Sequence, residues 1–392
     1  MITVANIWTE YFADSFVEAH PDLKRDPAFN SLNFAMTLRT NGKMPDDNTF
    51  FMRQRGERSL FERGVAGHFL ARVANQLNWV QMNRFCAAGF GPRRVDLIHA
   101  HFGTTGARLV PTLARVGLPT VVSMYGSDIS ASVRSPRWVR RYRRMFPVVD
   151  RIIVLCETAR QRLIDLGCPP EKIIIWNLPA GIESYPLLEP RNGPQVRFLT
   201  AARFVEKKGY NILLPAFRRL VDDGVDCFLT IVGYGSDGDR ITRQMESPGL
   251  QERVAIHDTR SVGNFSEFYH GKLRDSDIFV LPSITAANGD DEGGPSLTLV
   301  CAQAAGRPVI CTPFPGSEIS VHEGTSGLYC RENDVDSLYE RMKYLGARPE
   351  MWEAMGRRGH QVVQENFGKD NQISLLKEMY RDLVFRRKAG AA

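Results

Sequence analysis

Short apolar runs alternate with longer amphipathic segments along most of this chain, and this alternation constrains the fold more than any other feature. In the first half the runs are "VDLIHAHF" (95–102), "PTVVSMY" (119–125), "RIIVLC" (151–156) and "KIIIW" (172–176). They are rich in β-branched residues and bounded by Pro, Gly or charge, which is typical of strands buried in a parallel sheet. The segments between them have helical character, so the sequence predicts a doubly wound α/β sheet.

The same alternation restarts after "LLEPRNGPQ" (187–195), a polar stretch with Pro and Gly that we interpret as a linker. The second set of strand-like runs covers 196–203, 227–235, 252–258, 277–283 and 307–312, with helical periodicity in 210–224 and 294–306. We therefore predict two doubly wound parallel sheets. Ligands bind at the carboxyl ends of the strands in such sheets, and the cleft between the two is the expected site.

Composition excludes several classes of protein. The chain has 392 residues, 43% of them hydrophobic, which is enough for two domain cores, and its net charge of +6 is too small to indicate a nucleic-acid binder. Its seven cysteines form no C-x-x-C pair, so neither a disulfide framework nor a zinc site is expected. With neither a signal-peptide pattern nor a long apolar run, we expect a soluble, cytoplasmic protein that can rest on a membrane surface.

One loop of the second half has the features of an anion site. "ITAANGDDEGG" (284–294) follows a predicted strand and leads into a helix that we expect to have Pro295 in its first turn and Gly306 at its end. The first turn of a helix offers unpaired N–H groups and a partial positive charge, and Gly293 with Gly294 lets a ligand approach the backbone. Glu292 would repel a phosphate, so we expect it to accept hydrogen bonds from sugar hydroxyls; placement near the helix dipole alone is the alternative.

A second loop supplies positive charge. In "AARFVEKKGY" (201–210), Arg203 and Lys208 follow the first strand of the second half, at the same rim as Glu292. Two cations facing a helix N-terminus would clamp a diphosphate whose charge develops on a leaving group. Alone, "EKKG" is more typical of a solvated turn before a helix; with the Gly-Gly-Pro helix start, it favours the clamp.

These motifs together resemble the retaining glycosyltransferases with the GT-B fold and an E-x7-E motif, known as glycosyl transferases group 1 or family 4. The second-half motifs are "LTAARFVEKKGYNILLPAF" (199–217), "TIVGYGSD" (230–237), "DIFVLPSITAANGDDEGGP" (277–295), "AQAAGRPVICT" (302–312) and "GTSGLY" (324–329). The first half adds "DLIHAHFG" (96–103), "VVSMYGSDIS" (121–130) and "RLIDLGCPPEKIIIWNLPAGI" (162–182). The branch that they resemble most makes colanic acid and exopolysaccharide.

The resemblance implies transfer of a hexose from a nucleotide diphosphate sugar with retention, without metal or cofactor. It implies a front-face substitution in which the leaving diphosphate helps to deprotonate the acceptor. It also implies an N-terminal acceptor-binding domain (1–190), a C-terminal donor-binding domain (191–368) and a last helix (369–392) that crosses back to the first domain.

The resemblance assigns donor-site roles to the residues of this sequence that match the family's motifs. The resemblance implies that Arg203 and Lys208 contact the donor diphosphate and that Glu292 contacts the transferred sugar. It implies that Gly293, Gly294 and Pro295 form the turn whose backbone amides meet the phosphate and sugar. It places Gly233 and Gly235 in a turn near the nucleotide.

Acceptor-side positions carry over less firmly. Asp128 matches the acid of the family's "H-G-x-D" segment, and His101 matches the histidine of "HAHFG"; for both, a structural role that ties loops together is an equal alternative. The family's histidine before Gly-x-Asp is Tyr125 here, so the imidazole is lost.

Two further departures concern the nucleotide and the N-terminus. The second glutamate of E-x7-E, which in the family holds the ribose hydroxyls, is Val300 by spacing from Glu292 or Cys301 by alignment on "AQAAG". Its loss predicts a weaker grip on the nucleotide. Residues 5–26 also lack a Gly-rich turn after the first strand, so they do not indicate how the acceptor is recognised.

A basic, aromatic segment in the first half predicts a partner. "SVRSPRWVRRYRRMF" (132–146) interleaves Trp138, Tyr142 and Phe146 with six arginines: Arg134, Arg137, Arg140, Arg141, Arg143 and Arg144. Such a helix would rest on anionic headgroups at the inner face of the cell membrane and suit a glycan or polyprenyl-diphosphate-linked acceptor. A solvated helix face is the plain alternative. Nucleic-acid binding is disfavoured because no recognition module accompanies the charge.

Two functions remain in view from the sequence. The first is an active hexosyltransferase of surface polysaccharide assembly, favoured by the intact Arg203, Lys208 and Glu292. The second is a catalytically impaired homologue that binds sugar nucleotide or glycan as a partner subunit, suggested by Tyr125 and the missing second glutamate. A Rossmann dehydrogenase is disfavoured, because no G-x-G-x-x-G joins a strand to a helix with an acid about 20 residues further on.

Overall fold

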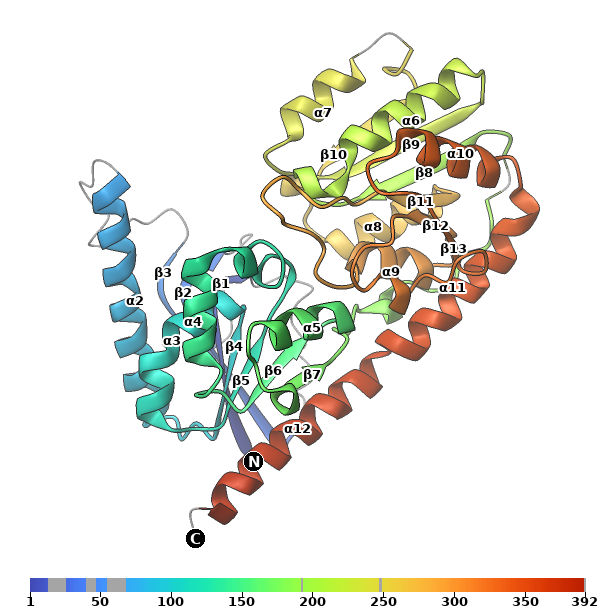
Figure 1. The fold of residues 1–392 in the computed structure, drawn as a ribbon. Coiled ribbons are helices and arrows are strands. Elements are labelled where there is room, and N and C mark those ends of the chain that lie inside the picture. The colour runs from blue at the N-terminus through green and yellow to red at the C-terminus, as the bar shows by residue number, and fades with distance from the viewer. Residues whose placement is uncertain (13–25, 40–46, 55–67, 192, 247–248, 391–392) are drawn as a thin grey trace. The chain divides into compact units, whose positions relative to one another are not determined.

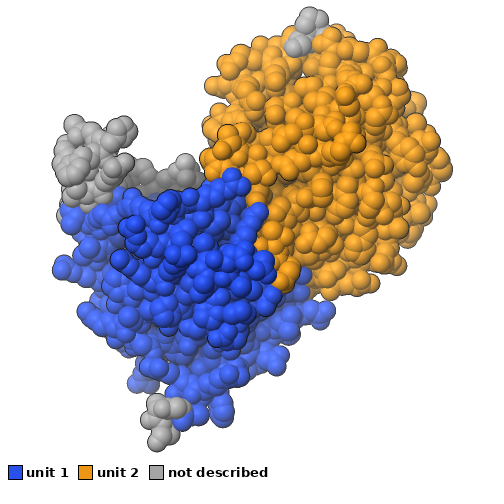
Figure 2. Space-filling model, in the orientation of Figure 1, with its two compact units in different colours: residues 1–155, 159–178, 370–392 blue, residues 156–158, 179–369 orange. Residues whose placement is uncertain are grey.

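The computed structural model describes residues 1–12, 26–39, 47–54, 68–191, 193–246 and 249–390 of the chain. They form two compact units, shown in separate colours in Figure 2. Unit 1 comprises residues 1–155, 159–178 and 370–392, and unit 2 comprises residues 156–158 and 179–369. The stretch 187–195, interpreted above as a linker, lies within unit 2.

Unit 1 is built on a parallel sheet with the strand order β3-β2-β1-β4-β5-β6-β7 (Figure 1). The strands are β1 (Ile2–Phe12), β2 (Phe29–Arg39), β3 (Thr49–Gln54), β4 (Leu97–His101), β5 (Thr120–Ser123), β6 (Arg151–Val154) and β7 (Ile173–Ile175). The helices are α2 (His68–Phe90), α3 (Gly103–Val116), α4 (Pro136–Met145), α5 (Glu157–Asp165) and α12 (Lys369–Gly390). Strands β4 and β5 are buried at every residue, as strands covered on both faces must be.

Helix α3 packs closely against the sheet because glycine occupies its contact face. A Cβ atom on Gly106 would lie 2.9 Å from both methyl groups of Val122, and one on Gly103 would lie 2.4 Å from Cε of Met124. Helix α12 is fixed to the same unit by buried polar contacts. Tyr380 donates to or accepts from Nδ1 of His99 at 2.6 Å, and the indole N–H of Trp176 donates to the Gln372 carbonyl at 2.8 Å.

Unit 2 is built on a second parallel sheet, with the order β10-β9-β8-β11-β12-β13. Its strands are β8 (Val196–Ala201), β9 (Cys227–Gly233), β10 (Val254–Asp258), β11 (Ile278–Leu281), β12 (Val309–Cys311) and β13 (Gly327–Tyr329). Its helices are α6 (Tyr210–Asp222), α7 (Gly238–Met245), α8 (Phe265–Arg274), α9 (Leu297–Ala304), α10 (Val335–Gly346) and α11 (Trp352–Phe367).

The strand order of unit 2 reverses between β8 and β11. The chain runs outward from β8 through β9 to β10, then returns so that β11 pairs with β8 on the other side, with Ile278 opposite Phe198. Loops leaving the carboxyl ends of such neighbours turn to opposite faces and leave a crevice, the usual ligand position in open α/β sheets. Here these loops are 202–209 and 282–296.

The predicted fold class is confirmed: both halves are doubly wound parallel sheets, and each quoted apolar run contains a strand. Helix α9 differs in its start. It begins at Leu297 with Ser296 as N-cap, so Pro295 precedes the helix instead of occupying its first turn, whereas Gly306 follows its end with a left-handed φ of 74° as expected. The turn after β1 falls in residues 13–25, outside the described part of the chain. Within the described residues, no helix has the length and apolarity to cross a membrane.

Candidate functional site

The loop after β8 carries the predicted cations. Arg203 is exposed two residues beyond the end of the strand, and a short 3-10 turn, Glu206–Lys208, ends at Gly209 with a left-handed φ of 68°. A Cβ atom on Gly209 would lie 1.8 Å from the Pro282 carbonyl oxygen, in the loop after β11. Glycine therefore lets the two loops approach at backbone distance.

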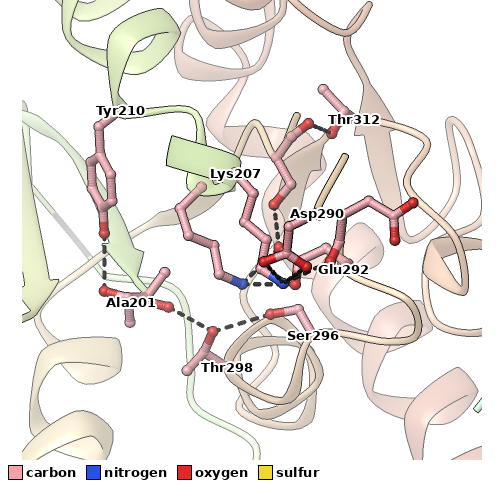
Figure 3. Close-up of polar contacts among 12 residues, drawn as sticks. Ala201, Lys207, Tyr210, Asp290, Glu292, Ser296, Thr298 and Thr312 are labelled. Carbon is pink, nitrogen blue, oxygen red and sulfur yellow. Dashed lines mark hydrogen bonds and ion pairs between the residues drawn. The ribbon is translucent and has the colours of Figure 1, made fainter. Parts of the chain in front are cut away.

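Lys208 and Glu292 form a buried ion pair across these loops (Figure 3). The Lys208 ammonium donates to both oxygens of the Glu292 carboxylate, at 2.6 and 2.8 Å, and the Ser283 hydroxyl donates to Oε1 at 2.6 Å. The two charged side chains are only 11% and 7% exposed. A buried carboxylate is tolerated when its charge is paired and its oxygens are hydrogen-bonded, as they are here.

The charges around Glu292 set its ionisation. Burial alone would raise the pKa of the carboxyl, but the positive charges of Lys208 and Lys207, with the hydrogen bonds from Lys208 and Ser283, outweigh it and hold the pKa below its ordinary value. Glu292 is therefore an acceptor of hydrogen bonds at neutral pH. That is the ionisation state required to accept hydrogen bonds from sugar hydroxyls.

Lys207 holds the acidic loop from the inside. Its side chain is buried, and its ammonium donates to the Asp291 carbonyl at 2.6 Å and pairs with the Asp290 carboxylate at 3.2 Å. Its own carbonyl accepts from the Ile284 amide at 2.8 Å. The adjacent lysines thus have different roles. Lys207 fixes the path of the loop, and Lys208 neutralises the charge of Glu292.

The N-terminus of α9 is fastened to the same strand end. The Thr298 hydroxyl donates to the Ala201 carbonyl at 2.6 Å and lies 3.4 Å from the Ser296 hydroxyl (Figure 3). Just before the helix, Gly293 has a φ of 65°, a conformation that residues with a side chain rarely adopt. The turn 293–295 therefore favours glycine at its first position, directly after Glu292.

Gly233 and Gly235 lie against the Arg203 loop. A Cβ atom on Gly233 would lie 1.9 Å from the Ala202 carbonyl oxygen, and one on Gly235 would lie 2.3 Å from that of Phe204. Reciprocal hydrogen bonds join the segments, from Phe204 N–H to the Tyr234 carbonyl at 2.8 Å and from Asp237 N–H to the Phe204 carbonyl at 2.9 Å. These glycines let the loop after β9 approach the Arg203 loop closely, whatever ligand the two loops serve.

The two candidate positions of the missing second glutamate lie in the apolar core of unit 2. Val300 and Cys301 are 0% and 1% exposed and pack with the other buried side chains of α9 and β11. The Cys301 thiol lies 3.5 Å from the Ala180 carbonyl, and burial raises its pKa. A buried, protonated thiol is not a nucleophile, which agrees with a packing role.

In unit 1, His101 and Tyr125 belong to a buried stack of rings. The His101 ring lies parallel to Trp8 with centroids 3.7 Å apart and stacks on His99 at 4.1 Å. Its Nδ1 is 3.1 Å from the Tyr125 hydroxyl and its Nε2 is 3.5 Å from Oδ1 of Asn6. Tyr125 thus provides a hydroxyl contact to His101 at the position where the family has an imidazole.

Asp128 acts as a cap for α3. Its carboxylate is buried and accepts from the amides of Gly103 at 2.9 Å, Thr104 at 3.1 Å and Tyr125 at 3.2 Å. Gly103 and Thr104 are the first residues of α3, whose own N-cap residue, Phe102, supplies no side-chain cap. Of the two roles left open by the sequence, this geometry supplies the structural one.

The basic segment forms a 3-10 turn (Ser132–Arg134) followed by α4. Its inner face is apolar, with Tyr142 and Met145 buried, while five arginines are exposed: Arg134, Arg137, Arg140, Arg143 and Arg144. Arg141 is half-buried against Trp138.

The structure brings Arg203, Lys208, Glu292 and the glycines of the 233–235 and 293–294 turns to one rim of unit 2, and it gathers His101, Tyr125 and Asp128 in unit 1. Sequence reasoning missed Lys207 and Ser283. The only available signal was the pairing of two lysines in one loop with two aspartates in the other. Among the described residues, no group of three or more His, Cys, Asp or Glu side chains is placed to hold a metal ion.

Comparison with known families identifies both halves of the chain. The model of the family described as "Glycosyl transferases group 1" matches residues 189–362, and that of the "Glycosyl transferase 4-like domain" matches residues 52–177. The chain belongs to the group 1 glycosyltransferases. The rim built by β8, β11 and α9 lies wholly inside the matched group 1 region of this glycosyltransferase.

Two curated relatives are named for polysaccharide biosynthesis. The amylovoran biosynthesis glycosyltransferase AmsK of Erwinia amylovora is 28% identical over 328 residues, covering 81% of this chain and 78% of AmsK. WcaL of Salmonella typhimurium, whose name places it in colanic acid biosynthesis, is 30% identical over 267 residues, covering 67% of this chain. The match spans 64% of the length of WcaL.

Solved structures share the fold of this group 1 glycosyltransferase. Sucrose-phosphate synthase from Thermosynechococcus elongatus aligns with a TM-score of 0.73 at 15% identity, covering 98% of this chain and 99% of that one. Anabaena HepE in complex with UDP aligns with a TM-score of 0.71 at 13% identity, covering 97% and 100%. At this identity the likeness establishes the GT-B architecture alone.

Replacement of the α3 cap tests its structural role. Asp128→Ala leaves buried backbone N–H groups without an acceptor, each costing about 1–3 kcal/mol, so we expect the free energy of unfolding to fall by about 3 kcal/mol or more. Asp128→Asn keeps one acceptor oxygen, and we expect a smaller loss. Urea unfolding followed by circular dichroism measures both; equal stability of Asp128→Ala and wild type would show that the cap contributes nothing.

The buried ion pair has a signature in a double-mutant cycle. Glu292→Gln and Lys208→Met each leave one buried charge unpaired, at a cost of about 3–5 kcal/mol, whereas the double variant leaves none. We therefore expect the double variant to lose less stability than the sum of the single variants. Thermal unfolding of the wild type, the two single variants and the double variant gives the interaction free energy between Lys208 and Glu292. Strictly additive losses of stability would show that the two side chains do not interact.

The same pair predicts a pH dependence. Because the pKa of Glu292 is lowered in the folded protein, the ionised carboxylate stabilises the fold fully above the unfolded pKa, and this stabilisation is lost as the pH falls through the folded pKa. The stability gap between wild type and Glu292→Gln should accordingly narrow on acidification. Unfolding of both proteins from pH 7 downward checks this, and a gap that widens at low pH would reverse the assignment.

Proposed function

We propose that this chain is a retaining glycosyltransferase that moves a hexose from a nucleotide diphosphate sugar to a growing surface polysaccharide. The observation that carries the proposal is the Lys208–Glu292–Ser283 cluster, buried beside Arg203 and the glycine turn before α9, at the point where the strand order of unit 2 reverses. The cluster combines cations for a diphosphate with an ionised acceptor for sugar hydroxyls at the usual ligand position of such a sheet.

Each group of the rim has a defined part in the proposed reaction. Arg203, Lys208 and the amides leading into α9 stabilise the negative charge that develops on the leaving diphosphate. Glu292 accepts hydrogen bonds from the transferred sugar and fixes its orientation. The bond between the anomeric carbon and the diphosphate oxygen breaks, and the bond to the acceptor oxygen forms on the same face. The acceptor proton passes to the leaving diphosphate, so the protein supplies no general base.

The donor and acceptor classes are supported by the relatives. HepE has been solved with UDP and with UDP-glucose, and AmsK is named for amylovoran biosynthesis. We extend these classes to this chain as a sugar nucleotide donor and a glycan or polyprenyl-diphosphate-linked acceptor.

The second candidate is a catalytically impaired homologue that binds sugar nucleotide or glycan as a partner subunit. The specific observation in its favour is the apolar burial of Val300 and Cys301, which leaves no carboxylate at either candidate position for the ribose hydroxyls. The same donor experiment separates the two candidates.

A donor panel tests the proposal. Purified protein is mixed with UDP-, GDP- and ADP-hexoses, and binding is followed by the shift of Tm and turnover by release of nucleoside diphosphate. We expect one donor to raise Tm and to be hydrolysed slowly. A donor that raises Tm without being hydrolysed, or no response to any donor in a folded protein, would contradict the transferase and favour the partner subunit.

Replacement of Arg203 tests its role in stabilising the leaving diphosphate. With the donor found above, we expect Arg203→Ala to lower the rate by about 10²–10³-fold, the usual effect of removing one donor that stabilises developing charge. Arg243→Ala, an exposed arginine on α7, is the matched control and should keep the wild-type rate. An undiminished rate in Arg203→Ala would remove it from the clamp.

Membrane attachment through α4 is tested separately. We propose that the exposed arginines of 134–144 rest on anionic headgroups, each contributing about 1 kcal/mol near the surface. The triple variant Arg137→Ala, Arg140→Ala and Arg144→Ala should lose co-sedimentation with phosphatidylglycerol vesicles, while the triple variant Arg243→Ala, Arg357→Ala and Arg358→Ala should keep it. Binding that is equal in both variants would reject this surface.

A further inference from the structure

Two arginines of unit 1 differ from the exposed arginines of α4. Arg108 projects from α3, which packs against both α2 and α4, and Arg141 projects from α4. The Arg108 guanidinium carbon lies 4.8 Å from the ring centre of Trp79 and 5.1 Å from that of Trp138, and the Arg141 guanidinium carbon lies 5.0 Å from Trp138. Two guanidinium groups therefore share one indole, in a partly buried position.

These guanidinium groups have no negative partner. Nε of Arg108 and an Nη of Arg141 are buried and donate to no acceptor, and neither side chain takes part in an ion pair with any described residue. Buried donors normally have a partner, and buried charge is normally compensated. The contrast with Lys207 and Lys208, whose ammonium groups are both paired with carboxylates, shows that this chain does compensate buried cations elsewhere.

The electrostatics point the same way. Burial lowers the pKa of Arg108 to about 10, and the neighbouring charges that act on it, those of Arg141 and Arg137, lower it further instead of opposing the shift. Burial likewise lowers the pKa of Arg141, assisted by Arg137 and Arg144. Neighbouring positive charge therefore disfavours the charged forms of Arg108 and Arg141 in the unliganded protein, and an anion beside them would relieve that cost.

We infer that Arg108 and Arg141 form a binding site for a phosphate or diphosphate group on unit 1. Guanidinium groups present planar pairs of N–H donors that match phosphate oxygens, and Nε of Arg108 and an Nη of Arg141 have no acceptor among the described residues. Trp79 and Trp138 hold the two guanidinium groups in place through their ring faces, so little side-chain freedom is lost on binding.

A phosphate carried by a lipid is one source of such an anion, and free phosphate is the other. The lipid reading rests on the proposed function, which calls for a polyprenyl-diphosphate-linked acceptor, but the anion site itself does not.

Calorimetric titration with inorganic pyrophosphate tests the site on the full-length chain. The variants are Arg108→Gln with Arg141→Gln, and a charge-matched control, Arg84→Gln with Arg115→Gln, whose arginines are exposed on α2 and α3. Arg203→Ala separates any binding at the rim of unit 2. We expect affinity to fall about tenfold or more in the first variant alone, with its Tm at or above that of wild type, because mutual repulsion is removed.

Vesicles distinguish the source of the phosphate. Phosphatidylcholine vesicles that carry polyprenyl diphosphate are compared with phosphatidylcholine–phosphatidylglycerol vesicles of equal negative charge. Preferential binding to the vesicles with polyprenyl diphosphate, if it is lost in the double variant Arg108→Gln/Arg141→Gln, supports the site and assigns it to a lipid diphosphate. This holds even where pyrophosphate alone binds weakly. Pyrophosphate binding lost in that variant without preferential capture supports a site for free phosphate.

Two outcomes overturn the inference. In the first, the Arg108→Gln/Arg141→Gln variant binds pyrophosphate and the diphosphate vesicles as tightly as the wild type. In the second, the control variant Arg84→Gln/Arg115→Gln loses as much affinity as the Arg108→Gln/Arg141→Gln variant. Donor hydrolysis by the wild type is measured beside these titrations and does not depend on an acceptor. A chain that hydrolyses its donor but has no anion site disproves this inference alone, and the reverse result disproves the proposed function alone.

Discussion

The pairing of β8 with β11 is the constraint on which the candidate site depends. These strands are far apart in the sequence, yet Ile278 lies opposite Phe198, so the loops that follow them emerge side by side. Only that adjacency places the Lys208 ammonium within 2.6 Å of the Glu292 carboxylate. Either charge would be costly at such low exposure without the other, so the ion pair depends on this sheet order.

A buried ion pair is weak evidence for stability, because desolvation offsets most of its attraction. What distinguishes this one is the rigidity of its surroundings. Lys207 holds the backbone of the acidic loop, and Thr298 fastens α9 to the end of β8. Gly209 lets the backbone of the loop after β8 contact the backbone of the loop after β11. A carboxylate held in this way keeps its orientation when a ligand arrives, which is the requirement for a site that acts by positioning and charge.

The sequence predicts the sheets well because buried parallel strands are continuous apolar runs, and it predicts Lys208 near Glu292 because both follow neighbouring strands. It fails where local chemistry departs from these patterns. Strand β1 carries the buried Asn6, whose amide donates to the Ser31 hydroxyl at 2.9 Å, so this region has no simple apolar run. Lys207 could not be separated from Lys208 either, because their different directions arise from a single 3-10 turn.

The start of α9 and the role of Asp128 show a second limit. Pro295 fits a first helical turn by propensity, but its ring and the Gly294 backbone pack against Gly316, where a Cβ atom would lie 2.7 Å from the proline, and the helix begins two residues later. Asp128 caps a helix 25 residues before it, which no local motif indicates. In both cases a tertiary contact decides what the local sequence leaves open.

Charge compensation distinguishes the two kinds of cation in this chain. In unit 2 the ammonium groups of Lys207 and Lys208 both meet carboxylates, so the site is balanced before a ligand binds. In unit 1 the Arg108 and Arg141 guanidinium groups meet only ring faces and other arginines. Uncompensated buried charge costs free energy in every unliganded molecule. The charge of the Lys207 and Lys208 site is therefore compensated without a ligand, whereas that of the Arg108 and Arg141 site is compensated only when an anion is bound.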